Sequence, residues 1–210
     1  YNPKTGKLLE TLDYPTILKN NAVGNFAVEG LTISGDGLTM WFANEEALTC
    51  DGERSSYTSG TDCRLYKFVR QTVHEKFKPA GQFVYRTEHW KYAQDVKSKA
   101  RRGIAGLCAL PDGSLLVLER DLSFSNALYG YLGYYVYHVA TPEWATDVTS
   151  VASLKTDTTW TAVSKTLLVS DSKSLFSFGN FEGICLGNVD ADELLLLTGE
   201  LEHLLLNLRK

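Results

Sequence analysis

Short apolar runs separated by compact turn residues dominate the chain and predict antiparallel β-hairpins. In residues 31–43, Ser-Gly-Asp-Gly separates Leu-Thr-Ile from Leu-Thr-Met-Trp-Phe-Ala, and in residues 107–118, Pro-Asp-Gly-Ser separates two Leu-rich runs. The Asp-Gly pairs accept the left-handed backbone angles that tight turns require. Residues 165–178 and 183–197 have the same arrangement with longer turns, so they predict two further hairpins.

The intervening segments are mostly typical of strands. Residues 64–69 and 134–139 concentrate β-branched and aromatic side chains, which favours β structure. Residues 88–102 have a helix-compatible composition, but their apolar residues form no long stripe, so we predict a loop whose Lys and Arg residues at 97–102 are solvated. Residues 201–208 fit either a helix or a terminal strand. The pattern therefore predicts an all-β chain.

An internal repeat is the most informative feature of the sequence. Its three copies begin at Val28-Glu-Gly-Leu, Ile104-Ala-Gly-Leu and Phe181-Glu-Gly-Ile, and their glycines are separated by 76 and 77 residues. Each copy continues into a turn and then into a strand that ends near an acid. These acids are Glu45, Glu119 and Glu200.

The length of the repeat suggests a β-propeller. Half of the period is about 38 residues, close to the roughly 40–45 residues of a four-stranded blade, so each repeat is predicted to span two blades. The prediction is a single domain over residues 1–210, an all-β propeller of about five to six blades, either complete or lacking part of the ring.

The repeat predicts a cluster of carboxylates, because equivalent positions of propeller blades converge on the central channel. Glu29 and Glu182 precede the repeat glycine, and Glu45 and Glu119 close the next strand. Carboxylates that converge repel one another unless a cation neutralises them, and hard oxygen ligands favour Ca²⁺ or Mg²⁺. The alternative is that these acids lie on the solvated rim and that Glu-Gly is a turn.

Two further positions are candidates for binding. In Glu119-Arg120-Asp121, alternation along a strand places the two acids on one face and Arg120 on the other. Arg120 suits a phosphate or carboxylate, or it bridges acids within the fold. Asp51 is either a metal ligand or the first residue of an ordinary turn.

Composition and charge narrow the function classes. The chain has 210 residues, 44% hydrophobic and 22% charged, with a formal net charge of −4, which gives no electrostatic reason to expect nucleic acid as a partner. No apolar run reaches the roughly 18 residues of a membrane-spanning helix, so membrane insertion is not expected. Cys50 and Cys63 flank a polar segment that a disulfide would close, or they are free.

Several motifs, in order, resemble the phytase-like domain family, also described as the esterase-like activity of phytase family. They are Asn25-Phe-Ala-Val-Glu-Gly-Leu-Thr, Ala43-Asn-Glu-Glu-Ala-Leu-Thr-Cys-Asp-Gly, Leu115-Leu-Val-Leu-Glu-Arg-Asp and Asn180-Phe-Glu-Gly-Ile, and the similarity covers most of residues 21–200. The resemblance implies a secreted or periplasmic β-propeller that hydrolyses phosphoesters or esters with the help of calcium. The positions it carries over are Glu29, Glu45, Asp51, Glu119, Arg120 and Glu182.

The leading hypothesis is a metal-assisted hydrolase of a small phosphoester or ester. Ca²⁺ held by the four glutamates would polarise the substrate oxygen, Arg120 would hold the anion, and a metal-bound water would attack. Because the sequence shows no recognisable nucleophile and base pair, the alternative is a non-catalytic binding or scaffold propeller with a structural ion in its channel. A lactonase-like enzyme would differ by substrate alone.

Overall fold

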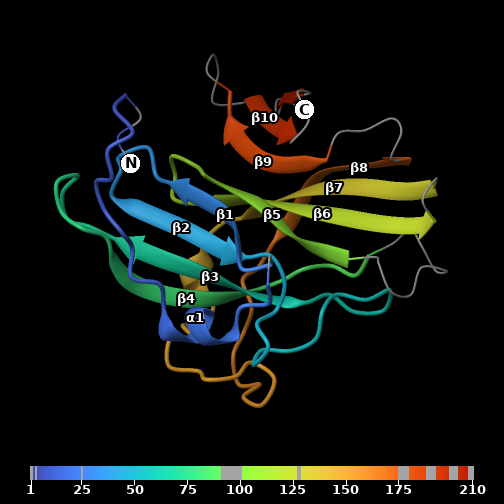
Figure 1. Cartoon of the computed structure of the whole chain (residues 1–210), viewed down its shortest axis with the longest axis horizontal. Helices are drawn as coiled ribbons and strands as arrows, with labels where there is room; N and C mark the ends of the chain where they lie inside the picture. The colour runs from blue at the N-terminus through green and yellow to red at the C-terminus, as the bar shows by residue number, and fades with distance from the viewer. Residues whose placement is uncertain are drawn as a thin grey trace.

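The computed structural model describes residues 2, 4–24, 26–90, 101–126, 129–174, 180–187, 193–198 and 203–207. These residues form three antiparallel sheets, each of which runs in chain order from one strand to its neighbour (Figure 1). The first sheet contains β1 (Val28–Ile33), β2 (Thr39–Asn44), β3 (Asp62–Val69) and β4 (Lys78–Arg86). The second contains β5 (Arg101–Ala109), β6 (Leu115–Asn126), β7 (Tyr129–Val139) and β8 (Thr166–Ser174). The third contains β9 (Phe181–Leu186), β10 (Glu193–Thr198) and β11 (His203–Asn207).

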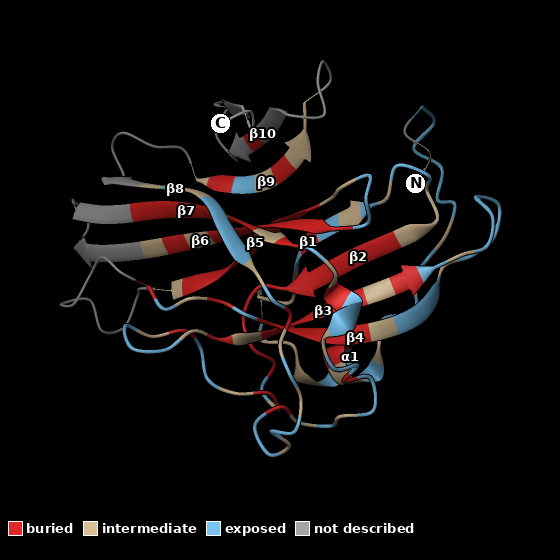
Figure 2. Cartoon of the chain, turned by 180° about the vertical axis from the view of Figure 1, so that it is seen from behind, coloured by how far each residue is buried: buried red, intermediate tan, exposed pale blue. Residues whose placement is uncertain are grey.

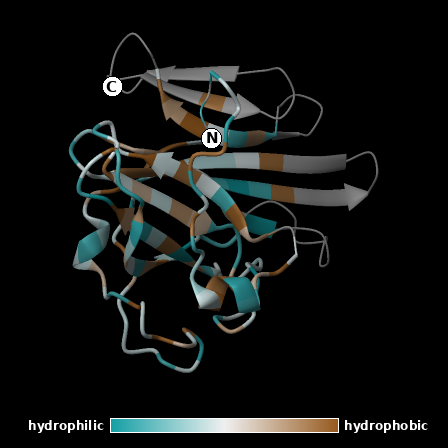
Figure 3. Cartoon of the chain, turned by 60° about the vertical axis from the view of Figure 1, so that its left-hand side comes forward, coloured by the Kyte–Doolittle hydropathy of each residue, from teal (hydrophilic) through white to brown (hydrophobic). Residues whose placement is uncertain are grey.

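Helical structure is confined, within the described residues, to α1 (Thr16–Asn21) and the short 3₁₀ helix η1 (Pro142–Trp144). Neither helix has the length and apolar character that crossing a bilayer requires. Much of the hydrophobic sequence lies on the strands, and the connections between them are mostly polar (Figure 3). The fold is therefore all-β, as the alternating sequence pattern predicts.

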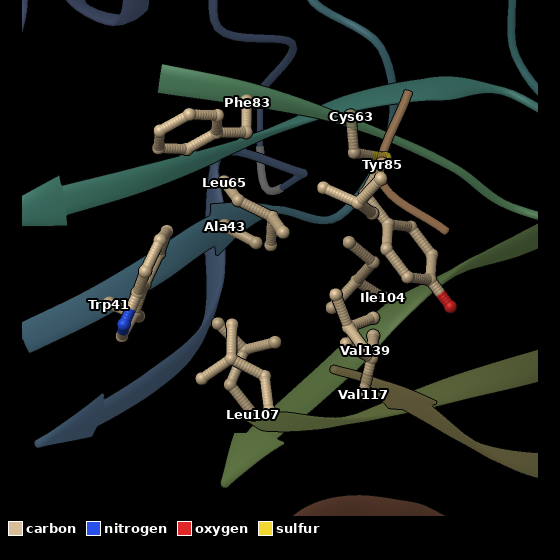
Figure 4. Close-up of a cluster of buried hydrophobic side chains, with 12 residues drawn as sticks. Trp41, Ala43, Cys63, Leu65, Phe83, Tyr85, Ile104, Leu107, Val117 and Val139 are labelled. Carbon is tan, nitrogen blue, oxygen red and sulfur yellow. The ribbon is translucent and has the colours of Figure 1, made fainter. Parts of the chain in front are cut away.

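The sheets stack face to face, and side-chain alternation supplies a core on both faces of the central strands. On β2, Trp41 and Ala43 face the second sheet, and Met40 and Phe42 face the N-terminal segment that includes α1. Figure 4 shows the first of these cores, in which side chains of β2 to β4 meet Ile104, Leu107 and other side chains of the second sheet. A separate core joins the second sheet to the third. Strands β2 and β5 are accordingly buried along most of their length (Figure 2).

The first strands of the three sheets, β1, β5 and β9, lie side by side (Figure 1), and the repeat glycines make this possible. A Cβ atom on Gly30 would lie 2.7 Å from Cγ of Leu107, and one on Gly106 would lie 3.1 Å from Cγ2 of Ile184. The first distance is shorter than real Cβ contacts, and the second would require Ile184 to move by a few tenths of an ångström. The repeat glycine therefore serves close packing between neighbouring sheets, and it is not a turn residue.

The predicted hairpins at 31–43, 107–118 and 183–197 are confirmed as β1–β2, β5–β6 and β9–β10. The hairpin predicted at 165–178 is wrong, because its described residues form the single strand β8, which pairs with β7 through Ser174. The strands predicted at 64–69 and 134–139 are parts of β3 and β7.

The repeat marks one sheet and not two blades. Each of its copies begins the first strand of a sheet, and the described residues form three sheets in all, so the estimate of five to six blades is wrong for this part of the chain. Long connections inside the sheets, such as residues 45–61 and 140–165, lengthen the period.

The structure also decides three local predictions. Arg102 belongs to β5 and is fully buried, so the solvated basic loop ends before it, and residues 91–100 of that loop lie outside the described residues. At the other end of the chain, residues 203–207 form the terminal strand β11, which supports the strand alternative. Cys50 and Cys63 are free thiols.

Candidate functional site

A β-bulge occurs at the same repeat position in all three sheets. In the first sheet Val28 pairs with Asn44 and Gly30 pairs with Ala43, so the residue between them, Glu29, is left without a partner. The same irregularity leaves Ala105 in β5 and Glu182 in β9 unpaired with the neighbouring strand. A bulge changes the direction in which a side chain points, and bulges are common beside functional sites. The two repeat glutamates are therefore presented by equivalent distortions of the backbone.

The register also corrects the alignment of the strand ends. Val28 pairs with Asn44, and its counterpart Ile104 pairs with Glu119, so Glu119 corresponds to Asn44. The residue that corresponds to Glu45 is Arg120. Glu200 of the third copy lies outside the described residues.

Arg120 lies between carboxylates from the neighbouring sheets. Its Nη2 donates to Oε1 of Glu45 at 3.2 Å, and its Nη1 donates to Oε1 of Glu182 at 3.0 Å and to Oδ1 of Asn180 at 2.8 Å. Asn180 in turn donates from Nδ2 to Oε1 of Glu182. Glu29 is close enough to influence, and be influenced by, these charges. We call these five residues the Arg120 centre.

Hydrogen bonds to its backbone carbonyl group fix the position of Glu45. Its carbonyl oxygen accepts hydrogen bonds from the amide of Ile104 at 3.1 Å and from the thiol of Cys63 at 3.2 Å. A Cβ atom on Gly103 would lie 2.7 Å from that carbonyl oxygen and 2.8 Å from Cγ of Glu45. Only glycine at position 103 therefore allows β5 to approach Glu45 so closely.

Two acids of the Arg120 centre, Glu45 and Glu29, bind protons more tightly than free glutamate does. Burial raises the pKa of Glu45 to about 7; the Arg120 charge opposes this rise, and the neighbouring charges of Glu29 and Glu46 add to it. Burial also raises the pKa of Glu29, an effect that Arg120 opposes and Glu182 reinforces. The centre therefore holds a carboxyl group that exchanges its proton near neutral pH.

Glu119 points to the opposite side of β6 from Arg120, in agreement with the predicted alternation. Its Oε2 accepts from Nε of Arg102 at 2.6 Å, and its Oε1 accepts from Nζ of Lys165 and from the hydroxyl of Tyr85, both at 2.7 Å. Arg102 also donates to the Tyr137 hydroxyl at 3.0 Å. Glu119 thus belongs to a buried ion-pair network between the first two sheets, apart from the Arg120 centre.

Asp51 belongs to another buried network. Its carboxylate accepts two hydrogen bonds from Arg64, at 2.7 Å from Nε and 2.8 Å from Nη2, and one from the amide of Leu154 at 3.0 Å. Arg64 reaches on to the carbonyl oxygens of Val148 and Val151. This pair fastens the connection between η1 and β8 to the first sheet.

Of the five predicted metal ligands, Glu29, Glu45 and Glu182 lie together, and Glu119 and Asp51 do not join them. The described part of the chain contains no group of three acidic, His or Cys side chains arranged to hold a metal ion. In the Arg120 centre, the guanidinium group itself lies between the carboxylates. The described side chains therefore do not fit a calcium ion in this arrangement, and metal binding by them stays a prediction.

Sequence reasoning missed Asn180, the buried arginines Arg64 and Arg102, and the partly buried Lys165 as functional or network residues. Asn180 precedes the repeat motif, where the other two copies have Ala27 and Gly103, so the repeat carries no signal for it. Its place at the start of the motif Asn180-Phe-Glu-Gly-Ile was the signal that could have identified it. Arg102 lies in β5 because this strand begins three residues before the repeat motif, at Arg101.

Comparison with known proteins places the chain in a family. No curated protein and no solved structure matches it. A family model described as "Esterase-like activity of phytase" matches residues 1–198, a range that includes the whole Arg120 centre. That description indicates a hydrolase-like function. The chain belongs to the Phytase-like family, as its motifs suggested.

Proposed function

We propose that the protein hydrolyses esters or phosphoesters at the Arg120 centre, with Glu45 as the acid–base group and Arg120 as the donor to negatively charged substrate oxygen. The observation that carries the proposal is the contact between Arg120 and the Glu45 carboxyl group, whose pKa is raised to about 7. Family membership supports hydrolysis as the class of reaction.

Glu45 has the properties that general acid–base catalysis requires. An acid–base group is most effective when its pKa lies near the working pH, because both protonation states are then populated. Ordinary glutamate is almost fully ionised at pH 7, whereas Glu45 is present in both forms. Its backbone contacts to Ile104 and Cys63 limit its movement.

Arg120 supplies hydrogen-bond donors for oxygen that gains charge during the reaction. A guanidinium group has five N–H donors, and three contacts to Glu45, Glu182 and Asn180 are made within the described residues. Among the described residues, the other two N–H groups of Arg120 have no hydrogen-bond partner, so they can donate to a substrate oxygen. Donors fixed in advance by the fold stabilise the transition state without having to reorganise.

The proposed step is an attack by water. The Glu45 carboxylate takes a proton from the water as its oxygen bonds to the ester carbon or phosphorus, and Arg120 donates to the oxygen on which negative charge develops. The bond to the leaving oxygen then breaks, and Glu45 returns its proton to that oxygen. The products are an acid and an alcohol, and Glu45 is again a carboxylate.

We also propose that the three sheets are blades of a β-propeller. In propellers, four-stranded antiparallel sheets are arranged around a channel, and the sheets pack face to face. The adjacent first strands β1, β5 and β9 and the cores between successive sheets support this arrangement. The Arg120 centre would then lie where the first strands of the blades converge.

Hydrolysis of p-nitrophenyl acetate and of bis(p-nitrophenyl) phosphate tests the function. The wild-type protein should release nitrophenol, and kcat/KM should rise with pH and level off above about 7, since the carboxylate form of Glu45 is the base. Glu45→Gln should lower kcat by about 10²–10⁴-fold, whereas the exposed Glu143→Gln should leave it unchanged.

A chelator and added Ca²⁺ provide the test of metal dependence. Turnover that is lost in a chelator and restored by Ca²⁺ would support the calcium prediction and contradict the proposed role of Glu45 as the base. Turnover at the background rate for both substrates, with and without Ca²⁺, would refute hydrolysis and leave the non-catalytic binding alternative.

A further inference from the structure

The two carboxylates that hold Arg120 differ in their access to solvent. The Glu45 side chain is 6% exposed, and the Glu182 side chain is 47% exposed. Water can replace the partner of an exposed carboxylate, whereas a buried carboxylate that loses its partner remains desolvated. Separating Glu182 from Arg120 therefore costs less than separating Glu45, so Glu182 is the exchangeable partner.

The oxygen atom of Glu182 lies where two donors converge. Oε1 accepts from Nη1 of Arg120 at 3.0 Å and from Nδ2 of Asn180. Asn180 is itself fixed, because its Oδ1 accepts from the same Nη1 at 2.8 Å. A guanidinium N–H and an amide N–H directed at one anionic oxygen are the donor pair that an oxyanion needs.

We propose that Arg120 and Asn180 form a binding site for one oxyanion, a carboxylate or phosphate group of the substrate, and that the Glu182 carboxylate fills this site until the oxyanion displaces it. The identification of the oxyanion as part of the substrate rests on the proposed function, but the exchange itself does not. Glu182 is displaced because it lies at the bulge of β9 with its side chain half in solvent, whereas Glu45 stays in contact with Nη2.

The expected size of the effect follows from the exposure of the ion pair. Pairs that are this accessible contribute little, so Glu182→Gln, which keeps the shape and removes the competing charge, should tighten oxyanion binding roughly two- to fivefold. Glu143 provides a matched control, because its side chain is 41% exposed and also forms an ion pair, with Lys67 in the first sheet. Glu143→Gln removes the same charge and should not change the affinity.

The experiment is a titration of the full chain with inorganic phosphate and, separately, with acetate, at pH 7.5 and constant ionic strength. Dissociation constants come from NMR shifts of the backbone amides of residues 180–184. Tighter binding of phosphate alone to Glu182→Gln identifies a phosphate group as the ligand, and tighter binding of acetate alone identifies a carboxylate. Adding Arg120→Lys to Glu182→Gln should remove most of the gain, because lysine lacks the planar fork of donors.

Three results would overturn the inference: binding to Glu182→Gln that is equal to or weaker than wild type, an equal gain in Glu143→Gln, or no binding of either anion to any variant. If the Arg120→Lys combination does not fold, the comparison of Glu182→Gln with Glu143→Gln decides alone. Anion binding requires no turnover, so a protein that binds more tightly as Glu182→Gln but hydrolyses no ester would refute the proposed function and retain this site.

Discussion

Replacing Glu45 by glutamine should make the protein more stable at alkaline pH, although the substitution removes a charge that contacts Arg120. Glutamine keeps the side-chain length, and its Oε1 can still accept from Nη2, as Glu45 does at 3.2 Å. What it removes is the cost of ionising a carboxyl group that is almost fully inaccessible to solvent.

The sign follows from proton binding. Because the pKa of Glu45 is raised from 4.5 to about 7, the folded state retains this proton between about pH 4.5 and pH 7, whereas the unfolded state has lost it. The folded state binds more protons in this window, so the contribution of Glu45 to the free energy of unfolding falls as the pH rises through it. Above about pH 7 the penalty is complete and constant.

The magnitude comes from the size of the pKa shift. One pKa unit corresponds to about 1.4 kcal/mol, and part of the window lies below pH 5, so ionisation of Glu45 should lower the free energy of unfolding by about 2–3 kcal/mol between pH 5 and pH 8. Glu45→Gln should lack this component. Relative to wild type, the variant should therefore gain about 2–3 kcal/mol between the two pH values.

Urea denaturation followed by tryptophan fluorescence measures this difference at pH 5 and pH 8 for wild type and variant. Titrating groups far from Glu45 are shared and cancel in the comparison. Glu29 and Glu46 interact with Glu45, so their contribution is part of the difference that is measured. Glu143→Gln is the control, and its stability should change with pH as the wild type does. An equal change with pH in wild type and Glu45→Gln would refute the reasoning, since Glu45 would then titrate alike in the folded and unfolded states.

Two further substitutions test the packing that positions the Arg120 centre. Gly103→Ala should destabilise the fold by about 1–3 kcal/mol and lower turnover, because its Cβ would lie 2.7 Å from the carbonyl oxygen of Glu45. Gly35→Ala is the control and should do neither, because nothing lies within 4 Å of a Cβ at that position. Equal urea midpoints for the two variants would contradict the predicted clash at Gly103. Arg102→Met should cost about 3–5 kcal/mol, because it leaves a fully buried carboxylate without the donor at 2.6 Å. Lys155→Gln should cost less than about 1 kcal/mol, because its ion pair with Glu53 is exposed on both sides, and similar losses for Arg102→Met and Lys155→Gln would contradict the assignment of Arg102 to a buried network.

The sequence alone predicted the strands and much of the centre, because both leave local signals. Alternating apolar residues and Asp-Gly turns locate β1–β2 and β5–β6, and the repeat identified Glu29 and Glu182 as equivalent. Glu45 and Arg120 were also named from the sequence. These four residues do lie in one centre, although they are far apart along the chain.

Register was the part that the sequence did not reveal. Glu45 and Glu119 both follow an apolar strand, and without knowledge of the bulges they align with each other. Asn44 and Glu119 pair with equivalent residues of β1 and β5, so Glu45 is offset by one residue from Glu119. A shift of one residue moves a side chain to the other face of the sheet. The buried arginines were missed for a related reason, since composition assigns charged residues to the surface and only tertiary contacts can bury them.

The opposite orientations of Glu119 and Arg120 connect the stability of the fold to the geometry of the candidate site. Glu119 holds the part of β6 around it in place between the first two sheets, through hydrogen bonds from Arg102, Lys165 and Tyr85. The next residue, Arg120, pairs across the ladder with Gly103 of β5, whose missing side chain admits Glu45. A carboxylate that was predicted to bind a metal thus orients the neighbouring arginine through the strand they share. Glu119 is buried and paired with several donors, so it resists displacement. The backbone of β6 at Arg120 therefore keeps its position when Glu182 moves away, and an oxyanion can take the place of that carboxylate.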